Sequence, residues 1–111
     1  MIFTETIKLN TKGFNDTLDI TKDVNDIVKN SKIKDGLVTL MCPGSTCTIT
    51  TIEFESGVIR DLQRTLEKIA PSDITYEHDL RWGDGNGFSH VRAALMKPSL
   101  SIPLLNASFF L

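Results

Sequence analysis

The sequence contains no run of basic residues and no long apolar segment, and each absence argues against a class of function. The 12 Lys and Arg residues are outnumbered by 14 Asp and Glu residues, which gives a formal net charge of −2. Surfaces that bind nucleic acid usually show clustered basic residues, so nucleic acid is not the expected partner. The opening Met1 to Glu5 segment lacks a basic stretch and soon becomes acidic. We therefore expect neither a signal peptide nor a membrane span, and predict a cytoplasmic protein.

Cysteine and histidine are also scarce, with two residues of each. Cys42 and Cys47 flank a Pro-Gly-Ser-Thr segment, and this spacing fits neither a CxxC redox pair nor a zinc knuckle. Free cysteine is among the most buried residue types, so the expected state is two buried thiols. The alternative is that one thiol faces a ligand.

The pattern of apolar residues predicts an α+β fold. We expect a compact single domain over residues 1–111, in which mixed or antiparallel sheets pack with two to three helices. Helical spacing of apolar residues predicts helices over 21–31, 58–69 and 87–96. Alternating or β-branched runs predict strands over 2–9, 37–42, 47–53 and 99–105. The strand over 37–42 reads as buried on both faces, Pro103 favours an edge or a bulge, and the Gly-rich segment 73–87 reads as a loop.

Three motifs, taken together and in order, resemble one protein family. They are Pro43-Gly44-Ser45-Thr46-Cys47-Thr48-Ile49-Thr50-Thr51-Ile52-Glu53, Tyr76-Glu77-His78 and Asn86-Gly87-Phe88-Ser89-His90-Val91-Arg92-Ala93. On these residues the chain is similar to the YjbQ family, whose members are often labelled secondary thiamine-phosphate synthases. The resemblance covers nearly the whole chain. It implies an α+β fold, a homotrimer, a histidine-lined metal or anion pocket, and a small phosphorylated metabolite as the partner.

The chain departs from the family pattern in two ways that bear on the site. Members usually carry His-x-His after Asn-Gly, and here Phe88 takes the first of these positions, so Phe88→His is expected to rebuild a metal site. Members also continue beyond the point at which this sequence stops. The chain therefore resembles a C-terminally truncated YjbQ-like domain without the family's last strands, which would leave the strand over 99–105 without its partner.

A divalent metal such as zinc is one candidate ligand of the site. A catalytic zinc takes three protein ligands, and His78 and His90 supply two of them. The third would be a carboxylate, from Glu53, Glu77 or Asp79, or a histidine of a neighbouring subunit. The alternative is that both histidines are ordinary side chains of a loop and a helix start.

A phosphate or another anion is the second candidate ligand, because the first turn of the helix over 87–96 would present N–H groups to it. The expected contacts are polar side chains near that helix start and near the Pro-Gly turn, namely Ser45, Thr46, Asn86, Ser89 and Arg92. In the alternative, Asn86 or Ser89 caps the helix and Arg92 faces solvent.

The residues and the resemblance leave three functions open. The first, implied by the resemblance, is a thiamine-phosphate synthase-like transferase that joins a hydroxymethylpyrimidine diphosphate to a thiazole phosphate. Its candidate catalytic residues are His78, His90 and Glu53. The second is metal-assisted hydrolysis. The third is a trimeric protein that binds a metal or a phosphate without catalysis, or an inactive truncated remnant.

Overall fold

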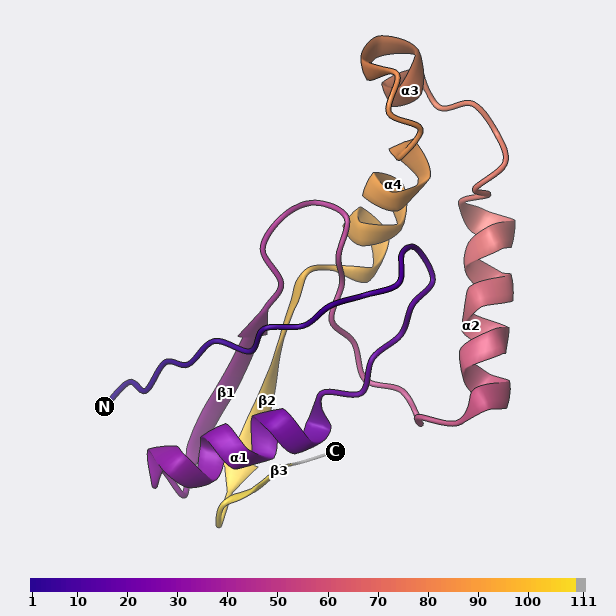
Figure 1. Cartoon of the computed structure of the whole chain (residues 1–111). Helices are drawn as coiled ribbons and strands as arrows, with labels where there is room; N and C mark the ends of the chain where they lie inside the picture. Colours follow the sequence, from indigo (N-terminus) through magenta and orange to yellow (C-terminus); the bar gives the residue numbers. More distant parts are fainter. Residues whose placement is uncertain (110–111) are drawn as a thin grey trace. The chain divides into compact units, whose positions relative to one another are not determined.

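The computed structural model describes residues 1–109 of the 111-residue chain. Within these residues the order is α1 (Thr21–Ser31), β1 (Gly36–Met41), α2 (Ser56–Ile69), α3 (Glu77–Trp82), α4 (Gly87–Met96), β2 (Ser99–Leu105) and β3 (Ser108–Phe109) (Figure 1). The strands form one sheet in the order β1-β2-β3. This content of helices and sheet confirms the predicted α+β class.

The chain divides into two compact units, one formed by Met1–Thr39 with the segment from Ser101 onward, and one formed by Leu40–Leu100. Each unit has its own buried apolar side chains. In the first unit they lie on α1 and β2, at Val24, Val28, Ile102 and Leu104. In the second unit they lie on α2, just after α2 and on α4, at Leu66, Ala70, Phe88 and Ala93. Every site residue predicted from the sequence lies in the second unit.

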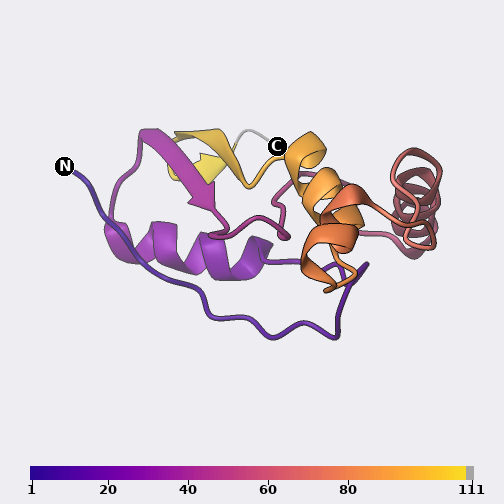
Figure 2. The ribbon, with the colours of Figure 1, turned by 90° about the horizontal axis from the view of Figure 1, so that it is seen from above.

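In the first unit, α1 lies beside the strands, and its axis crosses their direction in both views of the ribbon (Figures 1 and 2). A tight turn joins β2 to β3 and places Asn106 and Ala107 at positive φ, 51° and 61°, as a type I′ hairpin turn requires. Pairing then sets Leu104 opposite Phe109 and Leu105 opposite Ser108. The prediction that the strand over 99–105 lacks a partner is therefore wrong, because β3 pairs with the C-terminal end of β2.

The middle strand of the sheet is β2, although it carries Pro103, so the expected edge position of this proline is wrong. Among the described residues, Leu104 and Leu105 pair with β3, and Pro103 lies one residue before them in β2. Because proline lacks an N–H group, Pro103 donates no hydrogen bond to a neighbouring strand.

Three strand predictions need correction. β1 lies at the edge of the sheet, and Leu37 and Met41 are 65% and 59% exposed, so the strand is not buried on both faces. Residues 2–9 and 47–53 do not form strands in the structure. An alternating sequence shows which side chains a strand would bury, but a strand forms only where a neighbouring strand pairs with its N–H and C=O groups.

The helices follow the sequence pattern more closely. α1 and α4 have the predicted bounds, and α2 begins where the Glu55 carboxylate accepts hydrogen bonds from the Gly57 and Val58 N–H groups. Both hydrogen bonds lower the pKa of Glu55, and the bond from Gly57 has the larger effect. None of the helices in the described part of the chain combines the length and the apolar character that crossing a bilayer requires.

Candidate functional site

One carboxylate, that of Asp79, joins the start of α3 to the start of α4. Its Oδ2 accepts a hydrogen bond from the Tyr76 N–H over 3.2 Å, and its Oδ1 accepts one from the Gly87 N–H over 2.9 Å. Both donors belong to helix starts, whose N–H groups have no partner within the helix. The segment 73–87, predicted to be a loop, contains α3, whose start is capped by the contact between Tyr76 and Asp79.

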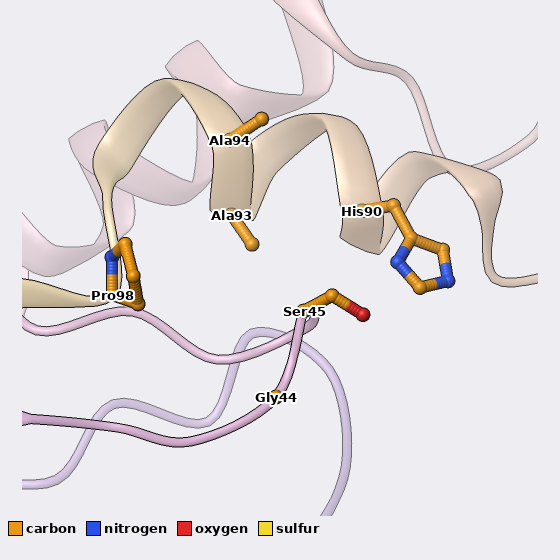
Figure 3. Close-up of a pocket in the computed structure, with 6 residues that line it drawn as sticks. All are labelled: Gly44, Ser45, His90, Ala93, Ala94 and Pro98. Atoms are coloured by element: carbon orange, nitrogen blue, oxygen red, sulfur yellow. The ribbon is translucent and has the colours of Figure 1, made fainter.

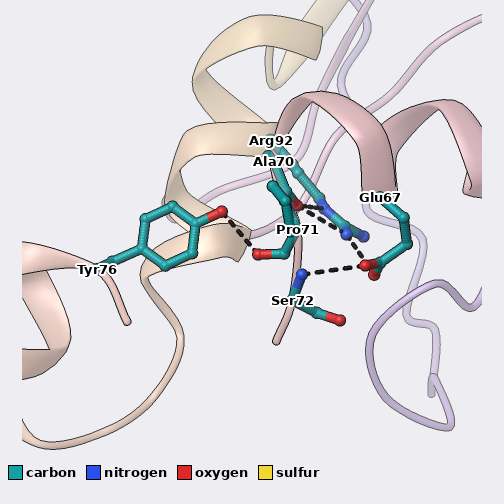
Figure 4. Close-up of polar contacts among 6 residues, drawn as sticks. All are labelled: Glu67, Ala70, Pro71, Ser72, Tyr76 and Arg92. Atoms are coloured by element: carbon teal, nitrogen blue, oxygen red, sulfur yellow. Dashed lines mark hydrogen bonds and ion pairs between the residues drawn. The ribbon is translucent and has the colours of Figure 1, made fainter. Parts of the chain in front are cut away.

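Gly87 allows α4 to begin directly against the side chain of Tyr76. A Cβ atom at position 87 would lie only 2.6 Å from the Tyr76 Cβ and 3.0 Å from its Cγ. Tyr76 is itself held, because its hydroxyl donates to the Pro71 carbonyl over 2.7 Å (Figure 4). The junction of α3 and α4 thus depends on the absence of a side chain at position 87.

This junction brings the two histidines together. The ring centroids of His78 on α3 and His90 on α4 are 4.5 Å apart, with an interplanar angle of 63°. His78 Nε2 lies 3.3 Å from Asp84 Oδ1. With its amide nitrogen turned inward, Asn86 places that nitrogen 3.0 Å from His78 Nε2 and 3.0 Å from Asp84 Oδ1. Asn86 therefore orients His78, and its side chain makes no capping hydrogen bond to α4.

Asp84 is a site residue that the sequence interpretation missed. It lies between Gly83 and Gly85 in the segment predicted to be a loop. The sequence does show a carboxylate two residues before Asn86, but it does not show which histidine that carboxylate faces. Of the three carboxylates considered as metal ligands, Glu53 and Glu77 are exposed, and Asp79 holds the helix starts.

His90 also lines a cavity of about 190 Å³ between α4 and the segment that follows β1 (Figure 3). The lining residues are Gly44, Ser45, His90, Ala93, Ala94 and Pro98. The Ser45 hydroxyl points towards the His90 imidazole. The rest of the lining consists of small residues, so Ser45 and His90 supply the polar side chains of this cavity.

Of the eight residues predicted for the site, Ser45 and His90 line the cavity and the other six do not. Glu53 and Thr46 are exposed, and neither is among the lining residues. Ser89 is half-buried, and its backbone N–H donates to the Asn86 carbonyl over 3.0 Å. The geometry therefore gives no support to a catalytic role for Glu53 or to an anion-binding role for Thr46 and Ser89.

Arg92, expected near a phosphate or in solvent, is instead buried in the second unit. Its Nε and Nη2 donate to the Ala70 carbonyl over 3.0 and 2.9 Å, and Nη2 lies 2.7 Å from Glu67 Oε1 (Figure 4). The guanidinium also lies over the Phe88 ring, 5.0 Å from its centroid. Arg92 therefore ties α4 to the end of α2, and its predicted role as a phosphate ligand is not supported.

Phe88 belongs to the same buried region and not to the histidine pair. It is 8% exposed, and residues two positions apart on an α-helix point about 200° apart around its axis. A histidine at position 88 would therefore replace the ring beneath Arg92 and would not join His90. The expectation that Phe88→His rebuilds a metal site is not supported by this geometry.

The side chains of the described part of the chain do not complete a zinc site. A catalytic zinc takes three protein ligands, and His78 and His90 are the two side chains that this fold places side by side. Within residues 1–109, no three His, Cys, Asp or Glu side chains are arranged to hold a metal ion. The predicted metal site thus lacks a third ligand in the described part of this chain.

The two cysteines form a disulfide and are not the two buried thiols expected from the sequence. Cys42 is half-buried and Cys47 is exposed, with their Cα atoms 6.1 Å apart, a separation that suits a disulfide. The bond closes the segment 43–46, which contributes Gly44 and Ser45 to the cavity. One wall of the cavity therefore lies inside a covalent loop.

The carboxylate of Glu67 gives the second unit a pH-dependent contact. The Ser72 N–H donates to Glu67 Oε2 over 3.1 Å. Hydrogen bonding from Ser72, and then from Arg92, lowers the pKa of Glu67 to about 2. Because this pKa is depressed in the folded state, the stabilisation is present above the ordinary value of 4.5 and is lost as the pH falls towards 2.

We expect Glu67→Gln to flatten the decrease in melting temperature between about pH 5 and pH 2, since the variant has no carboxylate to protonate. The side chain of Glu67 is 38% exposed, so solvent screening keeps the effect modest. Thermal unfolding followed by circular dichroism across this pH range measures it. Glu77→Gln, at an exposed position on α3, is the control. Equal slopes for the wild type and Glu67→Gln would contradict the assignment.

Comparison with known proteins finds relatives along nearly the whole chain. A family model described as UPF0047 protein YjbQ-like matches residues 5–111. A UPF0047 protein of Methanothermobacter thermautotrophicus is 32% identical over 107 residues, which cover 96% of this chain and 73% of the relative. The UPF0047 protein YugU of Bacillus subtilis is 26% identical, over 96% of this chain and 80% of the relative.

A solved structure supports the same relationship. The crystal structure of an uncharacterized conserved protein of the YjbQ/UPF0047 family from Clostridium acetobutylicum superposes with a TM-score of 0.80 and 31% identity, covering 92% of this chain and 78% of that one. Since the family model matches as far as residue 111, the expected C-terminal truncation is not borne out. By its family match, its relatives and its fold, this chain belongs to the YjbQ-like UPF0047 family.

Proposed function

We propose that this protein binds a small phosphorylated metabolite in the cavity beside α4, with His90 and Ser45 as its polar contacts. The observation that carries the proposal is the convergence of a hydroxyl and an imidazole in a cavity otherwise lined by small residues. Hydroxyl and imidazole N–H groups are hydrogen-bond donors suited to phosphate oxygens. The ligand is therefore expected to place its phosphate between these two side chains.

The proposed position differs from the one that the sequence favours, which is the first turn of α4. There the Gly87 N–H already donates to the carboxylate of Asp79. A helix start attracts one anion through its N–H groups, and a second anion at the same place would be repelled by the first. The side of α4, where His90 faces Ser45, is the better place for a phosphate.

The size of the cavity limits the ligand. Its volume of about 190 Å³ is below the roughly 300–1,000 Å³ of sites that hold drug-sized molecules. It has room for a phosphate with a small attached group. The transferase implied by the family resemblance would need space for two ring-containing substrates, so binding of one small phosphorylated molecule is the function that this cavity supports best.

Catalysis by proton transfer is the second candidate, and the contact between His78 and His90 favours it. The His90 imidazole reaches the cavity, and its neighbour His78 faces the Asp84 carboxylate. Such a pair can deliver a proton to a leaving phosphate or diphosphate oxygen. A thiamine-phosphate synthase-like transfer would use the two histidines in this way.

Assembly of this chain as a homotrimer stays a prediction.

Titration of the ¹⁵N-labelled protein with inorganic phosphate tests the binding proposal. We expect saturable shifts of the Ser45, His90 and Ala94 amide signals, and an affinity lowered by about tenfold in His90→Gln, because a hydrogen bond to a charged group contributes about 1.5–3 kcal/mol. Thr46→Ala, which removes an exposed hydroxyl outside the cavity lining, serves as the control. The absence of saturable shifts, or an unchanged affinity in both His90→Gln and Ser45→Ala, would rule out this site.

A further inference from the structure

The segment that carries Ser45 is held by one covalent bond, between Cys42 and Cys47. From its position we infer that this disulfide is a reversible switch: closed, it holds Ser45 opposite His90 in the phosphate cavity, and opened by thiol exchange, it releases Ser45 and weakens phosphate binding. This inference rests on the proposed function, because it assigns regulation to the same cavity.

The backbone around the segment shows why the disulfide controls it. On one side, the Cys42 N–H donates to the Pro98 carbonyl over 2.8 Å, and on the other the Ile49 N–H donates to the Lys97 carbonyl over 3.4 Å. Between these anchors, no hydrogen bond within the described residues joins the segment 43–48 to another part of the chain. The disulfide is therefore the contact that fixes the shape of this segment.

The two walls of the cavity differ in how they are held. His90, Ala93 and Ala94 lie on α4, whose backbone hydrogen bonds do not depend on the cysteines. Ser45 lies within the disulfide loop, next to Gly44 at a φ of 100°, a conformation that a glycine reaches far more easily than other residues. Opening the disulfide frees the loop that carries Ser45 and leaves α4 unchanged. A ligand that contacts both Ser45 and His90 then has to order this loop when it binds, which lowers its affinity.

Thiol exchange can reach this bond, because Cys47 is exposed and Cys42 is half-buried. The thiolate of a dithiol reductant attacks Cys47 Sγ, the S–S bond breaks, and Cys42 leaves as a thiolate that takes up a proton. The second thiol of the reductant then attacks the mixed disulfide and releases Cys47 as a thiolate. The reductant ends as a cyclic disulfide, two electrons pass to the protein, and oxidation by a small disulfide reverses these steps.

The predicted cytoplasmic location suits this role better than a purely structural one. Disulfides are rare in reducing compartments, and those that occur there are usually transient or redox-sensing. A bond that closes only a short loop, at a site with an exposed cysteine, belongs to the kind that small thiols can reach. The chemistry therefore favours a bond that opens and closes in response to the thiol pool.

The test compares the oxidised full chain, the chain reduced with dithiothreitol, and Cys42→Ser/Cys47→Ser, with inorganic phosphate as the probe. Amide exchange at Gly44 and Ser45 is measured without phosphate, and phosphate affinity is measured by the same ¹⁵N titration. We expect faster exchange and an affinity about fivefold lower after reduction, since the segment must then order on binding. The double variant is expected to match the reduced chain and to be insensitive to dithiothreitol.

The outcomes separate this inference from the proposed function. Equal phosphate affinity in the oxidised and reduced chains overturns the switch and leaves the phosphate site standing. If neither form binds phosphate, the proposed function fails, and unchanged Ser45 exchange upon reduction then overturns the switch as well. A disulfide that stays closed in a buffer of reduced glutathione is purely structural, and this result also overturns the inference.

Discussion

Replacing Arg92 with methionine is expected to lower the free energy of unfolding by about 3 kcal/mol, the largest effect of a single substitution that we foresee. The guanidinium donates twice to the carbonyl of Ala70, a residue only 1% exposed, and once to Glu67. Methionine keeps much of the side-chain volume but has no donor. The Ala70 carbonyl would then stay buried without its hydrogen bonds, and equilibrium unfolding in urea measures the loss.

The control for Arg92 is Arg64→Met on the surface of α2. Arg64 pairs with Asp61, and both side chains are well exposed, at 67% and 62%. Exposed ion pairs contribute little, so we expect a change within about 0.5 kcal/mol. Similar losses for the two variants would mean that the buried network does not hold α4 to the end of α2.

Replacing Gly87 with alanine is expected to destabilise the protein by about 2 kcal/mol, even though alanine favours helix more than glycine. The new Cβ would meet the Tyr76 Cβ at 2.6 Å. The Tyr76 Cβ is attached directly to the backbone, and the Tyr76 hydroxyl donates a hydrogen bond to the Pro71 carbonyl. The Tyr76 side chain therefore cannot easily move away from a new Cβ at position 87. The start of α4 would have to shift away from α3.

That shift has a second readout, because the junction also sets the contact between His78 and His90. Phosphate affinity of Gly87→Ala should fall together with its stability. Gly57→Ala, in the first turn of α2, is the matched control: its Cβ would meet the flexible carboxylate of Glu55, with the nearest oxygen at 2.9 Å. A stable Gly87→Ala variant with unaltered His78 and His90 signals would contradict the role assigned to the close approach.

The bounds of α1, α4 and β2 could be predicted from the sequence because their pattern is local. Apolar residues at helical spacing, or alternating along a strand, report which face an element buries. The same pattern failed at residues 2–9 and 47–53, which carry strand-like alternation without forming strands. It also failed in the segment 73–87, where the six residues of α3 are too few to show helical spacing of apolar residues.

The sequence by itself determined the residue types available for the site, a serine after a Pro-Gly turn and histidines at positions 78 and 90, and it indicated the family. Only the tertiary structure decided which of them meet. In the folded chain His90 lies beside His78 and faces Ser45 across the cavity, and a disulfide joins Cys42 to Cys47. It also bound Arg92 to the carbonyl of Ala70, 22 residues away along the chain. A hydrogen bond depends on a separation of about 3 Å in space, and the separation of two residues in sequence does not fix that distance unless they share one helix or strand.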